Sequence, residues 1–295
     1  MIMAKKFIIK KSIINSEKAA SEVLGMVMLL SIMMLVIGAI LLVGVPMIES
    51  GKSRARMDLS MNSFLSMQND IEEVVRGPIW IVDPANVSDA SGLGPSRETE
   101  FELMGGILTV RPNTANLTYS ITNKSEFNIT IAPGNISYNA DDETLIYENG
   151  AVIRKYESPT ALMISEPLIN IYDNEAGSTV VSIHAIWING SLSSAGGDGK
   201  GSAQIRSRNY NQTIEPAGMT ANSNVTILRI FSKYPETWMN FFDEKLRDAK
   251  LTQPDSYTIT GKNPLIIRIN GSNTNRSKPD IFLSLYESRI DVNVR

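Results

Sequence analysis

The sequence predicts an α+β protein in which a long N-terminal transmembrane and amphipathic helix precedes a mainly antiparallel β head with one short helix. Residues 23–48 form an apolar run that contains no charged residue. Residues 54–76 then space their apolar side chains three and four positions apart, which is the period of an amphipathic helix. From residue 101 onward, short β-rich runs alternate with turn residues, a pattern typical of a β-sandwich or an extended curved sheet.

The apolar run is long enough to cross a lipid bilayer. A helix over its 26 residues is about 39 Å long, whereas the hydrocarbon core of a bilayer is about 30 Å thick. Helices in the cores of soluble proteins rarely contain more than about 14 uninterrupted apolar residues. No second run of this length follows in the sequence, so we expect a single membrane crossing near the N-terminus.

Basic residues are concentrated on the N-terminal side of the apolar run. Lys5, Lys6, Lys10, Lys11 and Lys18 precede it, and Lys52, Arg54 and Arg56 follow it. Lysine and arginine near a span favour the cytoplasmic side of the membrane. We therefore expect a single-pass protein of the cell membrane, with its N-terminus in the cytoplasm and its head outside the cell.

The amphipathic stretch follows the apolar run without an obvious loop. Its apolar side chains recur from Met57 to Val75, with charged residues between them. We expect one helix over residues 20–76 that ends at Gly77-Pro78, because glycine and proline are common just after helix C-termini. The apolar face is expected to pack either on the head of the same chain or on the same helix of other subunits.

Within the head, two segments carry clear local signals. Asn149-Gly150 lies between two β-rich runs and is the strongest hairpin signal in the chain, because this pair favours the positive φ angles of a type I′ turn. The segment from Pro235 to Ala249 instead groups its aromatic side chains on one helical face. We expect one short helix there.

Composition argues against several classes of function. The net charge is −3 and no basic stripe is interleaved with aromatic residues, so the sequence predicts no nucleic-acid partner. Cysteine is absent, and with it disulfides and thiolate metal sites. The single histidine, His184, lies in a β-rich run and is expected to be structural. The sequence shows no catalytic or metal-ligand pattern, so we expect neither enzyme activity nor a cofactor.

The residues just before the apolar run, Lys18-Ala19-Ala20-Ser21-Glu22, reverse the order of an ordinary secretory signal. Such a signal places its small-residue cleavage site after the apolar stretch, whereas here the small residues precede it. This arrangement resembles the class III signal peptide of archaeal type IV pilins and related pilin-like proteins, over about residues 16–50. The resemblance implies that a membrane-embedded prepilin peptidase cuts between Ala19 and Ala20 and leaves the apolar helix on the mature protein.

Glu22 would be the third residue after this cut. Bacterial type IV pilins have a glutamate that registers subunits at the fifth mature position, so an assembly role for Glu22 follows only by analogy. Because an unpaired carboxylate near a bilayer is costly, one hypothesis is that Glu22 pairs with the new amino group of Ala20 on a neighbouring subunit. The alternative is that its carboxylate lies at the level of the lipid headgroups without a partner.

Asn-x-Ser/Thr sequons are frequent after the membrane span. The chain has ten of them, where chance at this composition would give roughly four. They begin at Asn86, Asn116, Asn123, Asn128, Asn135, Asn189, Asn211, Asn224, Asn270 and Asn275. We predict N-linked glycans at these positions, which would shield exposed sheet edges from pairing with other chains. The alternative is a polar β surface that is simply rich in Asn and Thr.

These features divide the chain into a class III leader peptide (1–19), a transmembrane and extended amphipathic helix (20–76), a linker (77–100) and an extracellular β-rich head domain (101–295). We hypothesise a noncatalytic pilin-like cell-surface protein, and its large head favours a minor or accessory subunit of a type IV filament. Its expected partners are the membrane, the prepilin peptidase, and copies of itself or other pilin-like subunits held through the N-terminal helix. The alternative is an uncleaved single-span surface adhesin or receptor that binds carbohydrate or protein. A surface enzyme ranks behind both.

Overall fold

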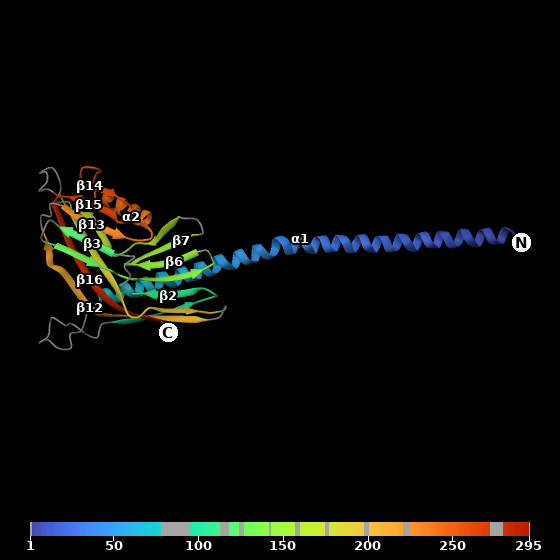
Figure 1. Ribbon diagram of the computed structural model, residues 1–295, viewed down its shortest axis with the longest axis horizontal. Coiled ribbons are helices and arrows are strands. Elements are labelled where there is room, and N and C mark those ends of the chain that lie inside the picture. Colours follow the sequence, from blue (N-terminus) through green and yellow to red (C-terminus); the bar gives the residue numbers. More distant parts are fainter. Residues whose placement is uncertain are drawn as a thin grey trace. The chain divides into compact units, whose positions relative to one another are not determined.

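The computed structural model describes residues 2–77, 95–112, 118–123, 127–141, 143–156, 160–174, 177–197, 201–220, 225–271 and 280–294. The chain forms two compact units, Met1–Ala55 and Arg56–Arg295. In the described residues, the first unit is helical throughout, and the second contains the strands and the short helix (Figure 1).

Helix α1 (Ile2–Arg76) belongs to both units. Its residues up to Ala55 form the described part of the first unit, and its residues from Arg56 onward belong to the second. Between residues 21 and 55 nearly every side chain is exposed, and none of the most apolar 18-residue window is buried. This helix is long and apolar enough to cross a membrane. An apolar helix left exposed in this way fits a membrane anchor, because water would otherwise surround its hydrophobic side chains.

The second unit contains a five-stranded sheet built around two long strands. Its strands are, in spatial order, β1 (Ser96–Glu102), β12 (Ser202–Thr220), β16 (Asp280–Val294), β10 (Ser178–Asn189) and β9 (Ile169–Asp173). β10 and β16 run parallel in register from Ser178↔Asp280 to Asn189↔Asp291. The other neighbouring pairs of this sheet are antiparallel.

The described residues of the second unit form two further sheets, both antiparallel between the pairs assigned. The six-stranded sheet has the order β11 (Ser193–Gly196), β2 (Ile107–Arg111), β5 (Asn135–Ala140), β6 (Glu143–Glu148), β7 (Ala151–Lys155) and β8 (Ala161–Ser165). The third sheet has the order β14 (Tyr257–Thr260), β15 (Leu265–Asn270), β13 (Val225–Phe231), β3 (Thr118–Asn123) and β4 (Phe127–Ile131). Helix α2 (Pro235–Asp248) follows β13.

The sheets enclose two hydrophobic cores. The first contains the aromatic side chains of α2 together with apolar side chains of the third sheet and of β9, β10 and β16. The second surrounds the C-terminal part of α1, which packs among β1, β2, β5, β6, β10, β12 and β16. β10 gives Val181 and Ile183 to the first core and Ile186 and Ile188 to the second. Successive side chains of a strand point to opposite faces, so this strand divides the two cores.

The predicted fold class is confirmed: a long N-terminal apolar helix precedes a mostly antiparallel β-rich domain with one short helix. The β region is three sheets around two cores rather than one sandwich or one curved sheet. The predicted linker over residues 77–100 is too long, because β1 begins at Ser96. Residues 78–94 of that range lie outside the described residues.

Candidate functional site

The residues that the sequence assigns to processing and assembly lie on α1. Lys18, Ala19 and Ala20 are helical, and their side chains are outside the described part of the structure. Glu22 is exposed on the same helix. Cleavage after Ala19 and pairing of Glu22 therefore stay predictions.

Beyond Ala55, α1 is part of the hydrophobic core of the second unit. Its buried apolar side chains are Met57, Phe64, Met67, Ile71, Val74 and Val75. The rings of Phe64 and Phe101 pack edge to face with their centroids 5.4 Å apart. Of the two expected partners for this apolar face, the structure has the head of the same chain. The face is consequently not available for packing against other subunits.

Gln68 is a polar residue inside this apolar face and is 2% exposed. Its Nε2 donates hydrogen bonds to the carbonyl oxygens of Gly150 at 2.7 Å and Glu166 at 2.9 Å. One side-chain amide thus satisfies two backbone acceptors, of which the one at Gly150 lies in the turn between β6 and β7. Nothing in the sequence distinguishes Gln68 from an exposed glutamine.

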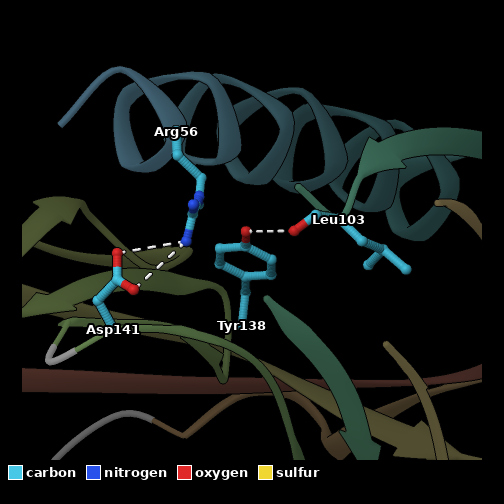
Figure 2. Close-up of polar contacts among 4 residues, drawn as sticks. All are labelled: Arg56, Leu103, Tyr138 and Asp141. Atoms are coloured by element: carbon cyan, nitrogen blue, oxygen red, sulfur yellow. Dashed lines mark hydrogen bonds and ion pairs between the residues drawn. The ribbon is translucent and has the colours of Figure 1, made fainter. Parts of the chain in front are cut away.

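Charged pairs flank the buried face of α1. Figure 2 shows Nη1 of Arg56 donating to both carboxylate oxygens of Asp141, at 3.4 and 3.3 Å, and the hydroxyl of Tyr138 donating to the carbonyl of Leu103 at 2.7 Å. Asp58 accepts from Nη1 of Arg154 at 3.2 Å, and Glu143 accepts from Nε of the same arginine at 2.8 Å. Asp141 and Glu143, on either side of the β5–β6 turn, are thus paired with arginines.

Acidic side chains that lie close together in the sequence, such as Asp141 and Glu143, can bind a metal ion only if their carboxylates are free. In the described residues, no group of three or more His, Cys, Asp or Glu side chains could hold a metal ion. Asp141 and Glu143 are instead occupied by Arg56 and Arg154. The carboxylates of Asp141 and Glu143 therefore hold α1 and β7 by ion pairs.

His184 is half-buried on β10. Its Nε2 lies 2.8 Å from the hydroxyl of Ser288 on β16, and its ring is tilted against Tyr286 with centroids 5.8 Å apart. Burial, and to a smaller extent the positive charge of Arg76, lower the pKa of His184 to about 4. The imidazole is therefore neutral near pH 7, in keeping with the structural role expected of it.

The sequon asparagines fall into three groups. Asn86, Asn116, Asn224 and Asn275 lie outside the described residues, and Asn123, Asn128 and Asn211 lie in strands whose side chains there are not described. The side chains of Asn135, Asn189 and Asn270 are described and are half-buried. Nδ2 of Asn189 donates to Asp291 at 3.0 Å, and Nδ2 of Asn270 donates to the carbonyl of Asp255 at 3.3 Å. Glycosylation stays a prediction at all ten positions.

A polar cavity of about 210 Å³, which no sequence pattern predicts, lies on the six-stranded sheet. Its walls come from one face of β2, β5, β6 and β7 and from the segment between β13 and α2. The lining residues are Arg111, Asn135, Ser137, Asn139, Thr144, Ile146, Glu148, Lys155, Lys233 and Tyr234. Strand alternation places these side chains on the face opposite to the one that covers α1.

Glu148 is a buried carboxylate in this cavity and is 3% exposed. Its Oε1 accepts hydrogen bonds from the hydroxyl of Ser232 at 2.7 Å and from the indole of Trp238 at 2.5 Å. Burial raises the pKa of Glu148, and the two hydrogen bonds and the charge of Lys233 partly offset that rise. No spacing motif marks Glu148, because its partners come from a distant part of the chain.

Comparison with known protein families identifies a family for most of the second unit. The sequence model of a family described as "Family of unknown function (DUF7289)" matches residues 84–276. Neither a curated protein nor a solved structure matches the chain.

Proposed function

The chain belongs to the DUF7289 family, whose function is unknown, and we propose that this member is a noncatalytic pilin-like surface protein, trimmed after Ala19 and anchored by α1. The N-terminus would lie in the cytoplasm, and the head would be displayed outside the cell. A minor or accessory place in a type IV filament is the role we favour for it.

The observation that supports this proposal is the double character of α1. Residues 23–48 are apolar and exposed, whereas the side chains from Met57 to Val75 build a core of the head. The same helix thus offers a membrane-spanning segment and a firm attachment for the head. Because the apolar face of its C-terminal part is covered by its own chain, contacts between subunits are expected to use residues 20–55.

The N-terminus of the native protein tests the processing step. Mass spectrometry of protein from its own cells should find a mature chain that starts at Ala20, with residues 1–19 removed. Replacing Ala19 with a bulky residue, in Ala19→Leu, should leave the leader in place, because the peptidase cuts after a small residue. Ala4→Leu, which lies away from the cut, is the matched control and should be trimmed normally.

An intact leader on the native chain would contradict the proposal and favour an uncleaved single-span adhesin or receptor. Assembly is tested separately by purifying surface filaments. The protein should be found in them, and the Ala19→Leu chain should be missing from them. Normal trimming together with protein confined to the membrane would contradict the filament role.

The proposal includes glycans on the extracellular sequons. The intact mass of the mature protein should exceed the mass of its residues 20–295, and chemical deglycosylation should remove the excess. A mass equal to that of the bare chain would show a polar surface without glycans.

A further inference from the structure

The polar cavity on the six-stranded sheet contains buried groups without a hydrogen-bond partner. Ser137 is 5% exposed, and its hydroxyl has no partner among the described residues. Oδ1 of Asn135, two positions earlier on β5, is also buried and also has no hydrogen-bond partner among the described residues. Burying polar atoms in this way is unfavourable unless something bonds them. Both residues line the cavity, so a ligand there would lie close to these unpartnered atoms.

The charge of the cavity favours an anion. Arg111, Lys155 and Lys233 line it, and Glu148 is the carboxylate among its lining residues. Three cations therefore face one acid whose ionisation is itself disfavoured by burial. Cationic side chains around a partly enclosed cavity bind carboxylates through charge-assisted hydrogen bonds.

The remaining polar groups favour an anion that also carries hydroxyl groups. Glu148 and the side-chain oxygen of Asn135 are acceptors, and an inorganic anion at neutral pH would offer them few donors. The hydroxyl of Ser137 can both donate and accept. The ring of Tyr234, also in the lining, adds an apolar surface against which a sugar ring could lie.

We propose that this cavity binds an acidic sugar of the uronic acid class. The carboxylate of the sugar would face Arg111, Lys155 and Lys233. Its hydroxyl groups would bond Asn135, Ser137 and Glu148. This binding does not rest on the pilin-like role, because either a trimmed or an intact chain could carry it.

A second cavity adjoins the first and provides room for a longer chain of sugars. It has a volume of about 390 Å³ and shares Lys233 and Tyr234 with the first cavity. Thr160, Thr237 and Asn240 are among its other lining residues and offer further hydroxyl and amide groups. Ligand sites commonly have volumes of about 300–1,000 Å³, so the two cavities together are large enough for more than one sugar unit.

Binding is tested on the full chain in a detergent whose headgroup carries neither sugar nor phosphate. The probes are glucuronate, glucose, which has hydroxyls without the charge, and acetate, which has the charge without hydroxyls. Glucuronate should bind with a Kd of about 1 mM, and each of the other two should bind at least about tenfold more weakly. A disaccharide that contains glucuronate should bind more tightly than the monosaccharide.

Three variants locate the site. Lys155→Gln and Lys233→Gln should each weaken glucuronate binding about tenfold. Ser137→Ala should weaken it about threefold while leaving the urea midpoint of the head equal or higher, because it removes an unpartnered buried hydroxyl. Lys250→Gln is the matched control, since it removes the same charge at an exposed ion pair with Asp173, and neither of these residues lines either cavity.

Several results would overturn the inference. They are no binding of glucuronate, equal binding of acetate or glucose, and unchanged binding in both lysine variants. Glycopeptide mapping gives an independent test, because a glycan on Asn135 would occupy the cavity. The proposed site thus removes Asn135 from the ten sequons at which glycans were predicted: we expect Asn135 to be unmodified, and a glycan there would contradict the site even if other sequons are modified.

Discussion

Among single residues, Gln68 joins α1 to the β6–β7 turn through two hydrogen bonds made by one amide. Burial also acts on two ionisable groups, since it lowers the pKa of His184 and raises the pKa of Glu148. Both shifts favour the uncharged form of the side chain. The sequence predicts a structural His184 from its place in a β-rich run. It could not identify Gln68 or Glu148, because the groups that surround them are more than 80 positions away along the chain.

Gln68→Leu should destabilise the head by about 2–4 kcal/mol, because it leaves two buried carbonyl oxygens without a donor. The measurement is urea unfolding of the full chain in detergent, followed by tryptophan fluorescence, since Trp238 is fully buried. Gln204→Leu changes an exposed glutamine on β12 and is the matched control. Equal midpoints for the two variants would contradict the role given to Gln68.

Lowering the pH should destabilise the head through His184. Its folded-state pKa is about 4 against 6.5 in the unfolded chain, so the unfolded state takes up the proton first. The stability is complete above about pH 6.5 and is lost as the pH falls toward 4, by up to about 3 kcal/mol. The measurement is the free energy of unfolding between pH 7 and 4, in the wild type and in His184→Gln.

The difference between those two proteins isolates the histidine, because carboxylates titrate in both. Glutamine keeps a hydrogen-bonding group facing Ser288 and does not titrate. The His184→Gln variant should lose less stability than the wild type over this range. Parallel pH profiles would show that His184 is ionised equally in the folded and unfolded states.

Among the elements, the β6–β7 hairpin shows what a local signal can predict and what it cannot. Asn149 and Gly150 have φ angles of 47° and 88°, as the sequence predicts for a type I′ turn. The burial of this turn was not predictable, because a turn signal says nothing of what covers the turn. Asn149 is 1% exposed, and its Oδ1 accepts from the backbone N–H of Ile186 at 3.0 Å.

The sequence did not predict strand β1, because few of its residues are typical of a strand. Its exposed positions include Glu98, Glu100 and Glu102, and acids have low β-propensity. Phe101 is its buried apolar side chain, so the strand carries little of the periodic signal by which strands are recognised. Its pairing with β12, more than 90 positions away, holds it in the sheet.

Gly261→Ala, in the turn between β14 and β15, should destabilise the head by about 2 kcal/mol, because a side chain would be strained at its φ of 76° and its Cβ would lie 2.5 Å from the carbonyl oxygen of Pro264. Gly105→Ala is the matched control: Gly105 has a φ of 86°, and a Cβ there would meet no atom within 4 Å. The control should cost only the backbone strain, about 1 kcal/mol. Urea midpoints that fall equally in both variants would show that the close approach of the Pro264 carbonyl contributes nothing.

At the scale of the whole molecule, the boundary between the two units on α1 does not coincide with the end of the apolar run. The apolar run ends at residue 48, and the second unit begins at Arg56. The sequence predicts the span from the length of its uncharged apolar run and the amphipathic continuation from the periodicity of its apolar side chains. It left open which partner covers the amphipathic face, because periodicity identifies a buried face without identifying its partner.

Truncation tests this division. A chain that begins at Arg56 should be folded and soluble without detergent, whereas one that begins at Gly77 should not fold. The second lacks six buried apolar side chains of α1, and at about 2 kcal/mol each their loss equals the whole stability of a typical domain. Size-exclusion chromatography and circular dichroism in buffer provide the measurement. A folded chain from Gly77 would show that α1 is dispensable for the head.

Strand β16 comes after every other described strand in the sequence, yet it lies between β10 and β12 in its sheet. During synthesis, β10 and β12 must therefore wait with unpaired edges until residues 280–294 have been made. Ribosomes add about 5–20 residues per second, so the N-terminal span emerges many seconds before the sheet can close. Chains halted before Asp280 should expose both edges and be degraded, and the nascent head should resist protease only once Val294 has emerged.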